Sequence, residues 1–453
     1  MLSISGNAEV PLLINAHSAF EEALAHITPA RLSRRSFVVA GALAGILATS
    51  KPVAARDALA SLQQAITPEA FGALGDGVTP DDDAFKKLLD SIGDGRSATV
   101  LLPQCYRLDS EIEVRNRSIK FIGRSSQGSQ WTGFRLGKRG AIALHKCNGT
   151  SIEDVGFRAD PDFLPEHDML SLFDSSQSSF TRTGFDGSKA EGVRYFRATG
   201  SSNLTRFIDL TARGASGEYG FFLGGPMPPD SKTGANIADF SVFSIGARGN
   251  CDAIVFDGSS GSVRFTNGAM NFGRRALWAK STGFLYFSAC GWENHTGDYT
   301  LQFDRAKTVS LTGCYINGGM QIREDCNDFR VNSCAINSSS YHGCEVAGMQ
   351  ISISDNIIRR NSTKERSTHS GIKLLDSCRN VSVANNLITK EWVFNRIKKE
   401  NILRNALQRY AIDTDAPAAQ GNIITGNVLT EFTEAPIGGA IPTGPHIFGN
   451  RVT

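Results

Sequence analysis

A short pattern of residues recurs seven times between residues 251 and 430. Each copy ends on a large apolar residue, here called the anchor. A small or amide residue lies two positions before the anchor, and an apolar residue lies five positions before it. The anchors are Met270, Trp292, Ile316, Ile336, Ile358, Ile388 and Leu429. The small or amide residues are Gly268, Cys290, Cys314, Cys334, Asn356, Asn386 and Asn427. Successive anchors are 22, 24, 20, 22, 30 and 41 residues apart, so the chain repeats one structural unit.

The repeat predicts an all-β solenoid. Apolar and polar residues alternate within each copy, which predicts strands with one buried face. A second short strand precedes each copy, as at Leu301 and Phe303, and the last such pair is Tyr410 and Ile412. About 22 residues hold two or three short strands, and one copy cannot bury its apolar face alone. We therefore expect a parallel β-helix with rungs roughly 4.8 Å apart, in which the Cys and Asn residues stack in columns. The alternative, an antiparallel β-sandwich, does not require residues at fixed offsets over seven copies.

The composition further limits the fold, the partners and the disulfides that we expect of this chain. The 453 residues are 41% hydrophobic, which is enough for a long core because each rung of a solenoid contacts only its neighbours. A net charge of +2 gives no reason to expect nucleic acid as a partner. The nine cysteines show no disulfide framework, and those in the repeat are expected to be small buried hydrophobes. A disulfide elsewhere stays open, for example one that involves Cys105, Cys147, Cys326 or Cys378.

Residues 1–55 are interpreted as an export signal with an N-terminal extension. The motif Ser33-Arg34-Arg35-Ser36-Phe37-Val38 precedes a short apolar run, and Val53-Ala54-Ala55 offers a cleavage site. The apolar run is too short for a stable membrane span. The arginine pair resembles the twin-arginine (Tat) export signal, which implies a location in the periplasm or outside the cell.

A helix is predicted after residue 79, within a linker and capping segment that covers residues 56–97. Thr79 is a suitable N-cap, Pro80 suits the first helical position, and Gly93 is a natural end. Phe85, Leu88, Leu89 and Ile92 give the helix an apolar stripe, which would cover the open end of the coil. The β-helix itself is predicted over residues 98–453. Residues 390–410, which are basic and helix-like, are predicted as a helical insertion.

The segment Phe71-Gly72-Ala73-Leu74-Gly75-Asp76-Gly77-Val78-Thr79 resembles the N-terminal signature of the pectate-lyase-like superfamily. Members of that superfamily are right-handed parallel β-helices, and they include polygalacturonases, polysaccharide lyases, epimerase-like proteins and phage tailspikes. Together with the repeats, the resemblance extends from about residue 66 to the end of the chain. It implies the fold and a polysaccharide ligand, and it does not specify the reaction.

One face of the coil is the candidate site. In the strand that precedes each copy, residues between two buried positions must point outward. These outward residues are Trp278, Lys280, Gln302, Asp304, Gln321, Arg323, Glu345, Lys373 and Asp413. The turns that enter these strands add Glu293, His295, Asp298, His342 and His369. A mixture of cations, carboxylates and an aromatic ring suits an acidic sugar chain. Substrate binding is therefore predicted for Trp278, Lys280, Gln302, Asp304, Glu345 and Asp298, although a merely solvated strand face is the alternative.

The resemblance to polygalacturonases is incomplete at the residues that carry their chemistry. His342-Gly343 matches a His-Gly pair of that family, and Gly371-Ile372-Lys373 matches its Arg-Ile-Lys with Gly in place of Arg. The paired Asp of the family falls on Gly318-Gly319, and its Asn-Thr-Asp falls on Thr296-Gly297-Asp298. Inverting hydrolysis needs two carboxyl groups about 6.5–9.5 Å apart. A different pair would have to come from residues such as Asp298, Asp304, Glu324 or Glu345.

β-Elimination needs a base at C5 of a uronate and a cation that stabilises the carboxylate. His342, Lys373 and Arg323 fall within about two rungs of one another and are the predicted catalytic residues. His342 or Lys373 would be the base, and Arg323 would neutralise the carboxylate. No cofactor is expected. A Ca²⁺ ion could replace the arginine, but no tight Asp cluster lies on this face, so no metal ligands are predicted.

The leading hypothesis is an exported polysaccharide lyase that cleaves an acidic polysaccharide. Three alternatives stay open: a glycoside hydrolase of polygalacturonase-like fold, a non-catalytic β-helix that binds polysaccharide in the manner of a tailspike, and a uronate C5-epimerase. The expected partner is an acidic polysaccharide. The sequence does not determine the oligomeric state, and a trimer would accompany the tailspike alternative.

Overall fold

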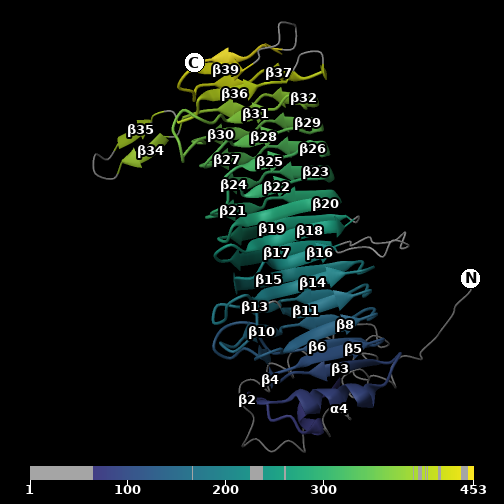
Figure 1. Cartoon of the computed structure of the whole chain (residues 1–453). Coiled ribbons are helices and arrows are strands. Elements are labelled where there is room, and N and C mark those ends of the chain that lie inside the picture. Colours follow the sequence, from purple (N-terminus) through teal and green to yellow (C-terminus); the bar gives the residue numbers. More distant parts are fainter. Residues whose placement is uncertain are drawn as a thin grey trace, which may run out of the picture. The chain divides into compact units, whose positions relative to one another are not determined.

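The computed structural model describes residues 65–453, apart from 166, 225–237, 260–261, 391, 396–399, 404, 406, 417–419 and 440–446. The predicted signal region, residues 1–55, lies outside the described residues. In the described unit, Ala65–Thr453, 39 strands pair in parallel and wind into a coil (Figure 1). This arrangement confirms the predicted right-handed parallel β-helix.

The coil has three walls, numbered here in the order in which the chain passes through them. Wall 1 consists of β1 (Ala65–Ile66), β3 (Ser97–Leu101), β6 (Ser118–Ile122), β9 (Ser151–Glu153), β12 (Ser179–Thr181), β15 (Thr205–Ala215), β17 (Ala238–Ala247), β19 (Val263–Asn271), the end of β20 (Arg275–Ser288), β23 (Ala306–Thr312), β26 (Asn327–Asn332), β29 (Met349–Ser354), β32 (Arg379–Ala384), β37 (Ile423–Thr425) and β40 (Ile447–Phe448). The long strands β15, β17 and β19 turn the corner and also contribute their ends to wall 2.

Walls 2 and 3 complete each rung. Wall 2 also contains β2 (Asp76–Pro80), β4 (Cys105–Leu108), β7 (Gly133–Leu136), β10 (Gly156–Ala159), β13 (Gly184–Asp186), β21 (Gly291–Glu293), β24 (Tyr315–Asn317), β27 (Ala335–Asn337), β30 (Ile357–Arg359), β33 (Leu387–Ile388), β38 (Val428–Leu429) and β41 (Arg451–Val452). Wall 3 consists of β5 (Glu111–Arg115), β8 (Ala141–His145), β11 (Asp168–Phe173), β14 (Arg194–Thr199), β16 (Tyr219–Gly224), β18 (Asp252–Ser259), the start of β20, β22 (Leu301–Phe303), β25 (Met320–Ile322), β28 (Cys344–Val346), β31 (Ile372–Leu374), β36 (Tyr410–Thr414) and β39 (Ala435–Gly439).

The register of wall 2 follows the anchors of the repeat. Met270 pairs with Trp292, Trp292 with Ile316, and the pairing continues through every predicted anchor to Leu429. In wall 3 the last predicted register is wrong by two residues, because Ile372 pairs with Ile412 and not with Tyr410. The connection before β36 is long, so the spacing in the sequence could not define where this strand enters the sheet.

The predicted columns of identical residues are present in the core. Asn356 donates from Nδ2 to Oδ1 of Asn386 over 2.9 Å, Asn386 donates in the same way to Asn427, and Asn427 donates to Asn450. Cys290, Cys314 and Cys334 continue this column and are buried. All nine cysteines are free, so the disulfide that the sequence left open does not form.

A stack of phenylalanine rings fills the middle of the coil behind wall 1. Phe180, Phe207, Phe240, Phe265 and Phe287 occupy one position in successive rungs, with ring centroids 4.5–4.9 Å apart and nearly parallel planes. These side chains are almost fully buried. Offset stacking adds to the free energy that comes from burying their apolar surface.

The corner between walls 1 and 2 is formed by one residue per rung in the left-handed conformation. Gly313, Ser333, Asp355, Asn385 and Gly426 each lie directly before the column of small and amide residues, with φ between 54° and 66°. Glycine and the short polar side chains tolerate this conformation better than bulky residues do.

The predicted capping helix is present, and it begins later than expected. The helix α4 (Asp82–Ile92) buries Phe85, Leu88, Leu89 and Ile92 and ends at Gly93, as predicted. Residues 76–80 form β2, so Thr79 is not the N-cap. Its hydroxyl and amide groups bond instead to the carboxylate of Asp76. A short 3-10 helix, η2 (Pro68–Phe71), precedes β2. Because β1 and β2 pair with the next rung, the coil begins before the predicted boundary at residue 98.

The predicted helical insertion at residues 390–410 is wrong. Within it, β34 (Trp392–Asn395) and β35 (Glu400–Leu403) pair as an antiparallel hairpin. The segment Trp392-Val393-Phe394 and Ile402 have strong β propensity, which outweighed the basic, helix-like residues between them.

Candidate functional site

The outward side chains of wall 3 form one column, as the sequence predicted. Pairing between adjacent rungs aligns them in the order Trp278, Gln302, Gln321, Glu345, Lys373 and Asp413. The residues on either side of each point into the core, as Leu301 and Phe303 do. Successive members are therefore about 4.8 Å apart along the coil.

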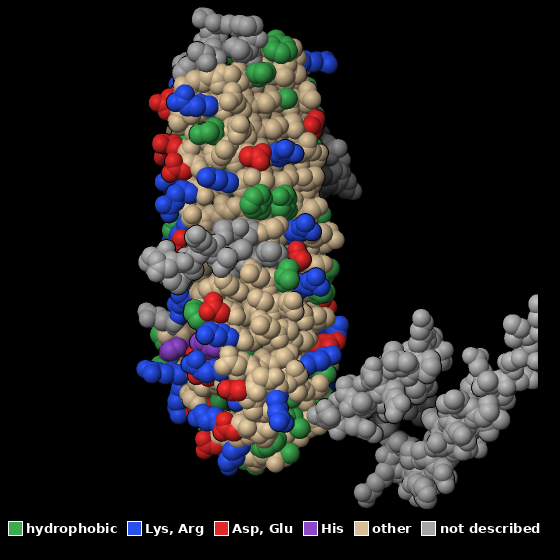
Figure 2. Space-filling model, turned by 90° about the vertical axis from the view of Figure 1, so that its right-hand side faces the viewer, with side chains coloured by type: hydrophobic (Ala, Val, Ile, Leu, Met, Phe, Trp, Pro, Cys, Tyr) green, Lys and Arg blue, Asp and Glu red, His purple; other side chains and the backbone are tan. Residues whose placement is uncertain are grey.

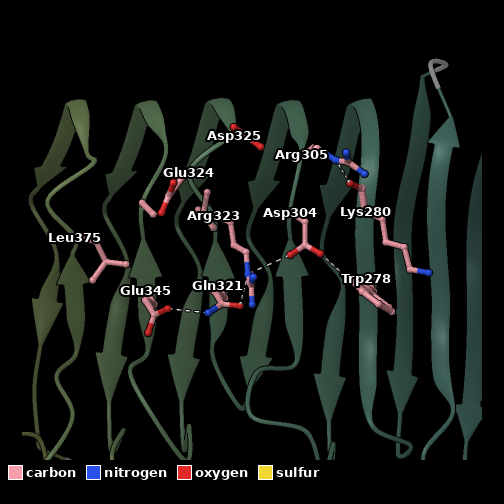
Figure 3. Close-up of a pocket in the computed structure, with 12 residues that line it drawn as sticks. Trp278, Lys280, Asp304, Arg305, Gln321, Arg323, Glu324, Asp325, Glu345 and Leu375 are labelled. Atoms are coloured by element: carbon pink, nitrogen blue, oxygen red, sulfur yellow. Dashed lines mark hydrogen bonds and ion pairs between the residues drawn. The ribbon is translucent and has the colours of Figure 1, made fainter.

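A groove with a volume of about 750 Å³ follows this column (Figure 3). Its lining consists of Trp278, Lys280, Asp304, Arg305, Gln321, Ile322, Arg323, Glu324, Asp325, Glu345, Ala347 and Leu375. Six of these residues belong to the predicted face: Trp278, Lys280, Asp304, Gln321, Arg323 and Glu345. The prediction missed Arg305, Asp325 and Leu375, which lie in the turns after the strands, where alternation does not define the direction of a side chain. Glu324, in one of the same turns, was considered only as a possible carboxylate for hydrolysis.

Wall 1 offers a different surface. At one outward position it presents Thr266, Ser288, Thr312, Asn332 and Ser354 in successive rungs. Figure 2 shows the side of the coil that lies on the right of Figure 1, where much of the surface is backbone or uncharged polar side chain. The groove of wall 3 is lined mainly by charged residues, so wall 3 remains the stronger candidate for a binding site.

Trp278 and Asp304 form one end of the groove. The indole Nε1 of Trp278 donates to the carboxylate of Asp304 over 2.7 Å, and Gln302 donates to the other carboxylate oxygen over 2.9 Å. The cations of Arg275 and Lys280 lie 3.9 and 4.2 Å from the centre of the Trp278 ring. The aromatic ring at this end of the groove therefore already has cation–π partners and is not a free stacking surface.

The position of Arg275 depends on a buried carboxylate that the sequence did not reveal. Asp252 is fully buried and accepts hydrogen bonds from the guanidinium groups of both Arg274 and Arg275. A buried charge needs such partners. The pairing orients Arg275 toward Trp278, which lies in the next rung of wall 3 above Asp252.

Arg323, Gln321 and Glu345 form the middle of the groove. Arg323 lies 3.3 Å from the carboxylate of Asp304 and donates to the side-chain oxygen of Gln321 over 3.2 Å. Gln321 in turn donates to one oxygen of Glu345 over 2.7 Å. Buried Tyr299, which the sequence did not identify, donates to the other oxygen over 2.8 Å. Two side chains from two rungs, Gln321 and Tyr299, therefore define the direction of Glu345, whose carboxylate borders the groove.

Lys373 lies next to the groove and is held by two carboxylates. Its Nζ is 3.0 Å from Asp413 and 2.8 Å from Asp415. Burial alone would lower the pKa of Lys373, but the hydrogen bonds to Asp415 and Asp413 outweigh burial and raise this pKa. Lys373 is therefore a protonated cation at neutral pH.

His342 lies in the turn before β28 and packs against His369, with ring centroids 4.9 Å apart. The amide of Ser370 donates to Nδ1 of His342 over 2.9 Å. Burial, assisted by the neighbouring His369, lowers the pKa of His342 to about 4. At neutral pH the ring is therefore neutral, with its proton on Nε2.

Asp298 and the two glycines complete the predicted set. Asp298 is exposed in the turn before β22 and is not part of the groove lining. Gly318 and Gly319 have φ values of 113° and 75°, and a Cβ atom at either position would lie 2.2–2.6 Å from a hydroxyl oxygen of Thr300 or Ser339. The paired Asp of the polygalacturonases therefore has no equivalent here, and the local backbone excludes it.

The described residues hold neither a metal-binding cluster nor a membrane-spanning helix. Among them, no group of three or more His, Cys, Asp or Glu side chains is arranged to hold a metal ion. Within the same part of the chain, no helix combines the length and apolar character needed to cross a membrane.

Comparisons with solved structures identify relatives in fold. A mannuronic acid-specific polysaccharide family 6 lyase from human gut microbiota superimposes with a TM-score of 0.54 at 12% identity, over 86% of this chain and 90% of the lyase. A mutant of the PL6 family alginate lyase AlyGC superimposes with a TM-score of 0.52 at 11% identity, over 83% of this chain and 53% of that one. No protein-family description and no curated protein sequence matches the chain. At these identities the likeness supports the parallel β-helix fold alone.

Proposed function

We propose that this protein binds and cleaves an acidic polysaccharide along the groove of wall 3. The observation that carries the proposal is the unbroken column from Trp278 to Lys373, which presents an aromatic ring, two amides, a carboxylate and a cation in successive rungs. A polymer with a repeating acidic unit matches such a repeating wall. Both structural relatives carry names that describe lyases of uronate polymers, which favours the same class of substrate.

The reaction that we propose is β-elimination. The carboxylate of a bound uronate must be neutralised before its C5 proton becomes acidic enough to remove. Arg323 is suited to this task because its side chain is 56% exposed and borders the groove. Lys373, which is held in its protonated form, supplies a second cation one rung beyond Glu345.

Among the candidate bases, Glu345 has the most suitable geometry. Nδ1 of His342 already accepts the Ser370 amide, and Lys373 has no free lone pair while it is protonated. The carboxylate of Glu345 borders the groove between these cations, and carboxylates serve as bases next to carbonyl groups in other enzymes. His342 and Lys373 are thus proposed to bind substrate through Nε2–H and Nζ. Trp278, Lys280, Gln302, Asp304 and Asp298 are proposed to contact neighbouring sugars.

The proposed step is balanced without a redox partner. Glu345 takes the proton from C5, the electrons of that bond form the C4–C5 double bond, and the bond from C4 to the glycosidic oxygen breaks. The departing oxygen takes a proton from water in the open groove.

The test compares Glu345→Gln with Glu324→Gln, a matched change of an exposed carboxylate in the same groove lining. Alginate and polygalacturonate are the substrates, and the readouts are ultraviolet absorbance of the unsaturated product and chain length by mass spectrometry. We expect Glu345→Gln to lower kcat about 100-fold or more, and Glu324→Gln to change it only a few-fold. New reducing ends without the absorbance would show that the reaction is hydrolysis and not elimination. Full activity of Glu345→Gln would show that Glu345 is not the base.

A second candidate is a β-helix that binds polysaccharide without cleaving it. The observation that favours it is that His342 and Lys373 are both engaged by other groups and that Gly318-Gly319 cannot carry the polygalacturonase carboxylates. Measurable affinity for either polymer, combined with no product after prolonged incubation, would support this candidate over the lyase.

We also propose that the protein is exported. The support is Arg34-Arg35 before a short apolar run and a small-residue site at residues 53–55. Cell fractionation of the Arg34→Lys, Arg35→Lys double variant tests the proposal. Retention of the double variant inside the cell, with export of the unchanged chain, is expected, and equal export of both would contradict a twin-arginine signal.

A further inference from the structure

Wall 3 continues beyond the groove toward the N-terminal half of the coil. Pairing of β20 with β18, of β18 with β16 and of β16 with β14 extends the outward column from Trp278 to Val255, Phe222 and Arg197 (Figure 1). Arg197 lies three rungs from Trp278, which corresponds to about 14 Å along the coil. The groove lining does not include it, so its surroundings define a separate place on the same wall.

Arg197 is a cation that no described carboxylate contacts directly. Burial raises the pKa of the nearby Asp168, and the charges of Arg194 and Arg197 both oppose that rise. Its guanidinium lies 5.5 Å from the centre of the Phe222 ring, and its side chain is half-buried. Nε of Arg197 is buried and has no hydrogen-bond partner among the described residues. No ion pair joins Arg197 to a carboxylate in the described part of the chain. Nε of the neighbouring Arg194 also lacks a hydrogen-bond partner, but that atom lies 3.3 Å from the carboxylate of Asp168, so only Arg194 forms a direct ion pair.

The packing around Arg197 orients it. Arg194 stacks on Tyr219, which donates to Asp168 over 2.9 Å, and Tyr219 lies 5.2 Å from the ring of Phe222. The aromatic rings and the Arg194–Asp168 pair thus form a platform beside the guanidinium of Arg197. A partly desolvated donor without a partner raises the free energy of the site, and a ligand carboxylate can accept hydrogen bonds from the N–H groups of a guanidinium.

We propose that Arg197 and Phe222 form a second binding site for a uronate carboxylate and its sugar ring, separate from the groove. The inference rests on the proposed function, because the ligand is a distant unit of the same acidic polysaccharide. Val255, which lies between Phe222 and Trp278, is only 2% exposed and therefore offers little contact. A chain that binds both places must span this gap, so the second site selects long chains over short oligosaccharides.

The test measures affinity as a function of chain length. Isothermal titration calorimetry compares oligouronates of two or three units with long alginate and polygalacturonate chains, using the full protein and Arg197→Met, which keeps the bulk of the side chain and removes its charge. Arg330→Met is the matched control, because Arg330 is an exposed arginine on wall 1. Thermal unfolding verifies that both variants fold.

We expect Arg197→Met to weaken binding of the long chain about tenfold or more, and to leave binding of the short oligomer unchanged. Arg330→Met should change neither value. Equal affinity of the unchanged protein and Arg197→Met for the long chain would overturn the second site and leave the proposed function intact. If the unchanged protein binds neither the short nor the long uronates, the proposed function fails, and the second site fails with it.

Discussion

The backbone amide of Ser370 donates a hydrogen bond to Nδ1 of His342, 2.9 Å away, across two adjacent rungs of the coil. This contact makes His342 a neutral donor through Nε2 rather than a base. It also explains why burial can hold the pKa of His342 near 4 while the ring stays hydrogen-bonded.

The first prediction concerns the pH dependence of activity. Because His342 is neutral above about pH 5, kcat/KM should show no inflection caused by this residue between about pH 6 and 8. His342→Gln, which keeps a side-chain N–H donor, should retain activity within about tenfold. Rate profiles of the two proteins provide the measurement. An inflection near pH 6.5 that disappears in His342→Gln would show that His342 does titrate as a base.

The second prediction concerns stability at low pH. Burial lowers the pKa of His295 to about 4, and Nε2 of this ring lies 3.1 Å from the carbonyl oxygen of Met270. In the unfolded chain histidine titrates near pH 6.5, so the unfolded state takes up protons first as the pH falls. The contribution of neutral His295 is thus complete above about pH 6.5 and is lost as the pH falls toward about 4, with a size of up to about 3 kcal/mol.

His295→Gln isolates this effect, because glutamine does not titrate. Free energies of unfolding in urea, measured at pH 7 and at about pH 4.5, should fall less for His295→Gln than for the unchanged protein. Parallel losses in the two proteins would mean that other groups account for the acid sensitivity.

The third prediction concerns the asparagine column. Oδ1 of Asn386 accepts both the backbone amide and the side-chain amide of Asn356, and its Nδ2 donates to Asn427 and to the carbonyl oxygen of Ile353. Asn386→Ala leaves several buried groups without partners and should cost about 3 kcal/mol or more of unfolding free energy. Thr312→Ala, at an exposed position of wall 1, should change it by less than about 0.5 kcal/mol. A small effect of Asn386→Ala would show that the column contributes little to stability.

The fourth prediction concerns Gly319. Its φ of 75° and the 2.6 Å approach of Ser339 Oγ leave no space for a side chain. Gly319→Asp should therefore lower the unfolding free energy by about 2 kcal/mol or more without creating hydrolytic activity. Gly313→Asp is the matched control, because Gly313 has a similar φ of 62° but no atom within 4 Å of its would-be Cβ. Equal stability of the two variants would show that φ, and not the close contact, determines the cost.

Much of the site was predictable because alternation in a strand determines direction. Gln302, Gln321 and Glu345 point outward from wall 3 for the same reason that their neighbours point inward. Residues in turns follow no such rule, which is why Arg305 and Asp325 were missed and why Asp298 lies outside the groove lining. The prediction of a helical insertion at residues 390–410 was wrong for a related reason, since no neighbouring copy constrains a segment outside the repeat.

The sequence by itself determined the period, the columns and the register of wall 2, from Met270 to Leu429, because one apolar position per rung must meet its equivalent in the next. Only the tertiary structure decided the chemical state of the site. Asp252 and Arg275, Ser370 and His342, and Asp415 and Lys373 are distant in the sequence, and protonation depends on which of these groups meet in space. Local patterns carry information about direction and burial, whereas pKa values and hydrogen-bond roles depend on partners that the fold brings together.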